Sequence, residues 1–210
     1  MSNTVKIYFS FRSPYSWLAL YRIYHVQSDL PVDFELIPCF PPPDSGGALN
    51  YSESKKQYIG EDIKRFADAY GLELCWPEPF DTDWKRPHSA FVYANEQSAG
   101  MDFCLNAYSA RFSEGLDIGR DDVIIGLAEV SRIDPDKTVN AADDSKIHRS
   151  VMKGMLRGNR DGLFGVPLFV YEGRKYWGND RVEWLIRDIY QKEGKVLPDL
   201  KEDPFQHPFK

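Results

Sequence analysis

The residue with the clearest chemical potential is a serine at the expected start of a helix. The strand-like segment 5–11 (VKIYFSF) runs directly into Ser13-Pro14-Tyr15-Ser16, and serine followed by proline is typical of a helix N-cap with proline in the first turn. A hydroxyl there can cap the helix, which is worth about 1 kcal/mol. It can also donate a hydrogen bond to an anionic group attracted by the positive end of the helix. Ser13 taken alone does not decide between these roles.

A second polar motif lies far along the chain. Residues 165–167 (GVP) stand directly before a strand-like segment, where proline is otherwise disfavoured. This proline is either an ordinary trans residue that starts the strand or a cis residue, and the sequence leaves both open. Asn179 and Asp180 follow the next strand, with Asp180 at capping-box spacing from Glu183. We therefore expect Asp180 to cap the last helix.

The remaining reactive side chains are isolated. Cys39, Cys75 and Cys104 are widely spaced, with no C-x-x-C pair and no Cys/His pair at zinc-ligand spacing. We expect reduced thiols that pack as small hydrophobic residues, and no metal site. His88, at the end of the run WKRPH, is a candidate acid or base, although a lone histidine is more often a surface or capping residue.

The elements that position these motifs follow from periodicity. Segments 5–11 and 32–37 alternate as strands on either side of a helix that starts at Pro14 and ends near Gln27. The apolar face of that helix would contain Trp17, Leu20, Tyr21 and Tyr24. This β-α-β unit should have parallel strands and a right-handed crossover.

The middle of the chain has helical spacing only. Helices are expected over 59–70, with Gly71 as the stop, and then over 87–99, 102–112, 121–130 and 141–156. Strand character returns at 168–171 and 175–177, joined by a Glu172-Gly173 turn. A last helix follows, with its apolar face formed by Val182, Leu185, Ile186 and Ile189.

This order of elements predicts an α/β protein with a thioredoxin-like fold. An all-helical insertion would separate the β-α-β half from the β-β-α half. We expect residues 1–51 and 163–210 to form the thioredoxin-like domain and residues 52–162 to form the helical insertion subdomain.

Charge and hydropathy narrow the function classes. The formal net charge is -6, which argues against nucleic acid or an anionic membrane as a partner, because both attract cationic surfaces. No apolar run reaches the length of a membrane span, and the N-terminus lacks the features of a signal peptide. The expected location is cytoplasmic.

Residues 8–18 (YFSFRSPYSWL) and 162–185 (GLFGVPLFVYEGRKYWGNDRVEWL), and more weakly 58–71, resemble the DsbA-like branch of the thioredoxin superfamily. The resemblance is to 2-hydroxychromene-2-carboxylate isomerases and kappa-class glutathione transferases in particular. Redox members carry C-P-x-C where this chain has S-P-Y-S, so we do not expect dithiol oxidoreductase chemistry at this site. The resemblance implies that glutathione binds here and that Ser13 holds its sulfur as a thiolate.

The resemblance also implies roles for the second motif. Pro167 would be the cis-proline of the family, and the backbone of Val166 would pair with the cysteinyl part of glutathione. Asp180 would meet the ammonium of the γ-glutamyl end, while Asn179 and the helix N-terminus would meet its carboxylate.

One loop departs from the family pattern. Residues 41–47 read PPPDSGG, where kappa-like enzymes have a glycine-rich loop with a lysine that contacts glutathione. Within the 39–56 loop, Asn50, Lys55 and Lys56 are candidate replacements.

The implied function is a glutathione-dependent isomerase that acts on a small aromatic-derived acid, as a homodimer. One alternative is a kappa-like glutathione transferase, which would release a conjugate. Another is a non-catalytic thioredoxin-like module that binds a peptide along the cis-proline edge.

Overall fold

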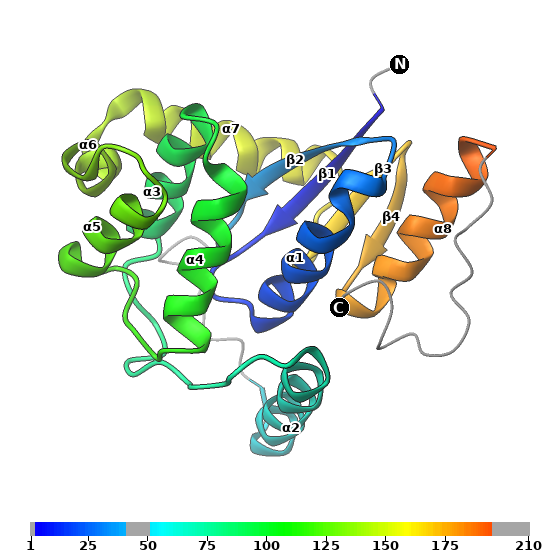
Figure 1. The fold of residues 1–210 in the computed structure, drawn as a ribbon, viewed down its shortest axis with the longest axis horizontal. Coiled ribbons are helices and arrows are strands. Elements are labelled where there is room, and N and C mark those ends of the chain that lie inside the picture. The colour runs from blue at the N-terminus through cyan, green and yellow to red at the C-terminus, as the bar shows by residue number, and fades with distance from the viewer. Residues whose placement is uncertain (1–2, 41–50, 195–210) are drawn as a thin grey trace.

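A four-stranded sheet in the order β2-β1-β3-β4 forms the centre of the computed structural model, which describes residues 3–40 and 51–194. β1 (Thr4–Phe9) pairs in parallel with β2 (Asp33–Pro38) and antiparallel with β3 (Leu168–Tyr171). β3 pairs antiparallel with β4 (Arg174–Trp177). The two halves of the chain therefore meet along β1 and β3 (Figure 1), which confirms the predicted thioredoxin-like α/β fold.

Helices cover both faces of the sheet and form the insertion (Figure 1). α1 and α8 pack on one face, and α7 packs on the other through close contacts with β2. Their bounds are α1 (Pro14–Val26), α2 (Glu53–Tyr70), α3 (Lys85–Glu96), α4 (Gly100–Phe112), α5 (Asp121–Val130), α6 (Pro135–Val139), α7 (Ser145–Arg160) and α8 (Val182–Lys192).

Alternation along the strands divides the buried side chains between the two faces. Ile7, Phe9 and Phe169 belong to the large apolar cluster under α1, whereas Tyr8 and Leu168 belong to a smaller cluster on the α7 side. The large cluster continues without a break into α3 and α4 of the insertion. The division into 1–51 with 163–210 and 52–162 stays a prediction.

Several element boundaries differ from the expected ones. The first strand ends at Phe9 rather than Phe11, because the chain turns at residues 10–13 with the Ser13 N–H donating to the Ser10 carbonyl. α7 begins at Ser145 rather than near residue 141, because the Asp144 side chain accepts the N–H groups of Lys146 and Ile147. The short helix α6 was not predicted, since five residues are too few to show a period.

The expected capping box before the last helix is wrong. Asp180 lies in a 3-10 turn and pairs with Arg181, and the residue before α8 is Arg181, which makes no side-chain cap. Glu183 instead forms an ion pair with Arg22 of α1. The apolar face of α8 is buried as predicted.

No helix among the described residues is long and apolar enough to cross a membrane.

Candidate active site at the start of the first helix

Ser13 is the N-cap of α1, as the sequence predicts. Its backbone is extended (φ -94°, ψ 113°), and its Oγ accepts a hydrogen bond from the Ser16 N–H at 3.2 Å. Pro14 has no N–H to offer, and the Tyr15 N–H has no carbonyl partner inside the helix because it lies in the first turn. The half-buried Ser13 hydroxyl therefore lies beside the positive end of α1.

The second motif lies directly against this hydroxyl. The Oγ of Ser13 lies 3.5 Å from the carbonyl oxygen of Val166, and the Val166–Pro167 peptide bond is cis. The Pro167 carbonyl accepts the N–H of Gly178 at 3.0 Å. This hydrogen bond holds the residue before Asn179 next to the Val166–Pro167 segment. Two motifs 153 residues apart in sequence thus meet at one point.

Hydrogen bonds with two helices of the insertion, α3 and α4, fix the turn that leads into Ser13. The Tyr108 hydroxyl donates to the Ser10 carbonyl at 2.8 Å, and His88 Nε2 accepts the Phe11 N–H at 3.2 Å. His88 Nδ1 lies 2.6 Å from the Trp84 carbonyl, so this nitrogen carries the proton. His88 is fully buried, so the expectation of a surface or capping histidine is wrong. Burial lowers its pKa to about 3, which keeps the ring neutral and unsuited to acid catalysis.

The buried His88 predicts a pH-dependent stability difference. The unfolded chain binds a proton at this residue below about pH 6.5, whereas the native residue stays neutral down to about pH 3. Its contribution is complete above the unfolded pKa and is lost as the pH falls, by about 1.4 kcal/mol per pH unit. The free-energy deficit of His88→Gln relative to wild type should therefore shrink by that slope between about pH 6 and 4 in urea unfolding. His148→Gln, which changes an exposed histidine, is the matched comparison, and a His88→Gln deficit that stays constant over this pH range would contradict the interpretation.

Asn179 and Asp180 differ sharply in accessibility. Asn179 is buried, and its backbone carbonyl accepts from Arg22 Nη1 at 2.6 Å. Its side-chain Nδ2 donates to the Tyr70 hydroxyl at 3.4 Å. Asp180 keeps 61% of its side chain exposed, beside Arg181. The Asp180 carboxylate is therefore accessible to a ligand. The buried Asn179 fixes the conformation of the turn that contains Asp180.

The buried cation Arg22 is a residue of the site that the sequence analysis missed. It lies in the expected apolar stretch of α1 with only 2% exposure, and it joins α1 to Asn179 and Glu183. Arg22 lies next to Tyr21 on the predicted helix, and the local sequence pattern does not indicate contacts with residues so far along the chain.

The middle of α2 contacts α1 beside Ser13, through Tyr15. The Tyr15 hydroxyl donates to Asp62 at 2.8 Å, and burial, followed by Asp62, raises the pKa of Tyr15. Asp180 also contributes to this rise. Lys55 lies over the Tyr51 ring and Lys56 pairs with Glu53, while Asn50 lies outside the described residues.

A family model for the DSBA-like thioredoxin domain matches residues 4–190. The chain belongs to this family. A protein of Sphingobium xenophagum named 2-hydroxychromene-2-carboxylate isomerase is 27% identical over 192 residues, covering 88% of this chain and 97% of that protein. A protein of the same name from Pseudomonas putida is 24% identical over 195 residues, covering 86% of this chain and 91% of that protein. A solved structure of a 2-hydroxychromene-2-carboxylate isomerase superposes with a TM-score of 0.79 at 21% identity, covering 91% of this chain and 98% of that one.

The cysteines of this DsbA-like chain lie away from the S-P-Y-S motif in sequence. Cys39 and Cys104 are buried, and burial raises the pKa of Cys39 to about 12, which leaves it protonated. Cys75 is exposed, so the expectation that all three cysteines pack as buried residues is wrong for this one.

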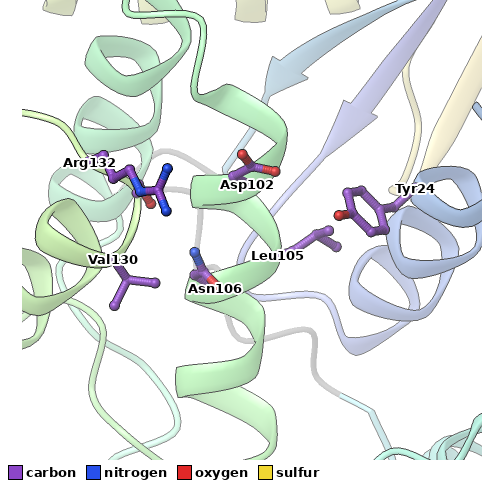
Figure 2. A pocket seen from close by; sticks show the side chains of 7 residues that line it. Tyr24, Asp102, Leu105, Asn106, Val130 and Arg132 are labelled. Carbon is purple, nitrogen blue, oxygen red and sulfur yellow. The ribbon is translucent and has the colours of Figure 1, made fainter. Parts of the chain in front are cut away.

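A hollow of about 430 Å³ lies elsewhere on this DsbA-like chain, across the outer surface of α4 (Figure 2). It is lined by Tyr24, Asp102, Leu105, Asn106, Val130, Ser131 and Arg132. Tyr24 is in the last turn of α1, about 16 Å along the helix axis from Ser13. The hollow is therefore separate from the space between Ser13 and Val166.

Proposed function

We propose that this protein is a glutathione-dependent isomerase of the 2-hydroxychromene-2-carboxylate type, in which Ser13 stabilises the glutathione thiolate. The names of the two relatives support the isomerase assignment. The observation that carries the role of Ser13 is the meeting of its hydroxyl with the Val166 carbonyl at the N-terminus of α1.

The Ser13 hydroxyl is suited to a charged acceptor. Its distance of 3.5 Å to the Val166 carbonyl is longer than the usual 2.5–3.0 Å of an O–H···O hydrogen bond. The proton is therefore only weakly engaged and can turn toward a sulfur anion. The Tyr15 N–H and the helix dipole add positive potential at the same point, which lowers the pKa of a thiol placed there.

The neighbouring residues suit the rest of a tripeptide. Val166 lies just before β3 and outside its ladder, so its backbone groups can pair with an extended ligand. The exposed carboxylate of Asp180 would bind the γ-glutamyl ammonium, held in place by the buried Asn179. When bound, glutathione supplies a thiolate that can add to and leave a conjugated carbon of the substrate without being consumed.

A cofactor-requirement assay tests this proposal. Purified protein is mixed with 2-hydroxychromene-2-carboxylate, and its isomerisation is followed with glutathione, with S-methylglutathione, or with neither. We expect turnover only with glutathione, whose concentration stays constant. Turnover that is equal without glutathione would contradict the proposal, and a stable glutathione conjugate that accumulates would assign a kappa-like transferase instead.

A further inference from the structure

Arg12, the residue before Ser13 in the chain, belongs to a carboxylate receptor that is filled by a side chain of the protein itself. The Asp81 oxygens accept hydrogen bonds from Arg12 Nε at 2.6 Å and from Arg12 Nη2 at 3.1 Å. The Trp84 indole N–H also donates to Asp81, at 3.2 Å. Two parallel guanidinium bonds and a third donor are the geometry that recognises a free carboxylate.

A second, buried cation supports this receptor. The side chain of Arg111 is fully buried, with Nη2 donating to the Phe80 carbonyl at 2.5 Å. Its Nε and Nη1 make no hydrogen bond within the described part of the chain. The guanidinium lies 5.1 Å from the Phe80 ring and 4.7 Å from the Trp84 ring, measured to the centroids. A buried cation with unused donors is costly unless an anion compensates it.

The two cations Arg12 and Arg111 favour a carboxylate at the position of Asp81, and a ligand could supply it in place of Asp81. Burial lowers the pKa of Arg111 to about 10, the nearby carboxylates of Asp81 and Asp117 partly offset this, and the cation Arg12 adds to it. If Asp81 turned away, Arg12 would lose its carboxylate partner and the buried Arg111 would lose one nearby negative charge. A ligand carboxylate in place of Asp81 would restore the balance.

Asp81 is well placed to leave. Its side chain is 54% exposed, whereas that of Arg12 is only 16% exposed. It lies on the coil segment between α2 and α3 rather than within a helix or strand. A carboxylate that is half exposed gains hydration when it leaves, which offsets part of the free energy of its pairing with Arg12.

We propose that Arg12 and Trp84, supported by Arg111, bind the carboxylate of an aromatic-derived second substrate, and that Asp81 occupies this place when no substrate is bound. The inference rests on the proposed function. Arg12 is adjacent to Ser13 in the chain, so a carboxylate held by Arg12 places the rest of the molecule near the proposed thiolate. The rings of Phe80 and Trp84 provide an aromatic wall beside it.

Calorimetric titration with salicylate, and with its uncharged amide salicylamide, tests the receptor. Arg12→Ala should weaken salicylate binding about tenfold or more. Asp81→Asn should tighten it about two- to fivefold, the size expected when a partly exposed competing ion pair is removed. Asp122→Asn is the matched control, because it removes an exposed carboxylate paired in the same way with Arg120. It should change nothing, and salicylamide binding should not respond to any of the three variants.

The same proteins are titrated with glutathione, so that failure of this inference and failure of the proposed function can be distinguished. Salicylate that does not bind wild type at millimolar concentration, or that binds Arg12→Ala as tightly as wild type, overturns the receptor. An Asp81→Asn variant that does not bind salicylate more tightly overturns the role of Asp81. Normal glutathione binding together with either result leaves the proposed function standing. Salicylate binding that depends on Arg12, together with no glutathione binding, supports the receptor and removes the isomerase proposal.

Discussion

Ser13→Ala is expected to reduce kcat of the glutathione-dependent isomerisation by about a hundredfold or more, the effect of removing one preorganised donor to a developing or stored negative charge. The hydroxyl is the side-chain donor at the N-terminus of α1 beside Val166. Its loss should also move the rise of activity with pH toward higher pH, because the bound thiol then ionises less readily. Steady-state rates across a pH series measure both effects.

The control for Ser13→Ala separates catalysis from helix capping. Asp144 caps α7 through its side chain, and Asp144→Ala removes a cap worth about 1 kcal/mol, as Ser13→Ala does. Asp144→Ala should lose a similar free energy of unfolding and keep its activity. Equal activities of Ser13→Ala and Asp144→Ala would reduce Ser13 to a structural cap.

Arg22→Met is expected to lower the free energy of unfolding by roughly 2–3 kcal/mol and to weaken glutathione binding. The side chain is 2% exposed, donates to the Asn179 carbonyl, and pairs with Glu183. Removing one partner of a fully buried ion pair costs about 3–5 kcal/mol. We expect less here, because the Glu183 carboxylate is 31% exposed and can be hydrated. Urea unfolding and glutathione titration measure the two losses.

Arg187→Met provides the matched comparison on α8. Arg187 is exposed and lies over the Trp184 ring, so its replacement should change unfolding by no more than about 0.5 kcal/mol and leave glutathione binding intact. If Arg22→Met lowered the free energy of unfolding but left glutathione binding unchanged, then Arg22 would stabilise the fold without positioning Asp180.

Local sequence signals predicted the fold well wherever the structure itself is local. Ser13-Pro14 at a helix start, Gly71 after a helix, and Glu172-Gly173 in a hairpin all have the conformations expected from their types, with positive φ at Gly71, Glu172 and Gly173. The predicted capping box before α8 failed because of a tertiary contact. Asp180 and Glu183 have the spacing of a capping box, but Glu183 forms an ion pair with Arg22 of α1, a helix far away in sequence.

The candidate site was only partly visible in the sequence for the same reason. Ser13 and Pro167 carried motifs, whereas Arg22, Arg111 and Asp81 looked like ordinary residues of helices and loops. Arg22 and Arg111 are buried, and all three residues have partners that lie far away in sequence, such as the Phe80 carbonyl that accepts a hydrogen bond from Arg111. Tyr24 illustrates the reverse error: it fits the apolar period of α1, yet it is 41% exposed and lines the hollow beside α4.

The most direct measurement is the ultraviolet thiolate absorbance of glutathione bound to the wild-type protein, followed as the pH is raised, with free glutathione and Ser13→Ala as references. We predict that the bound thiol ionises about one pH unit or more below the free thiol, and that most of this difference disappears in Ser13→Ala. A bound thiol that titrates like free glutathione, or a shift that Ser13→Ala leaves intact, would contradict the role assigned to this hydroxyl.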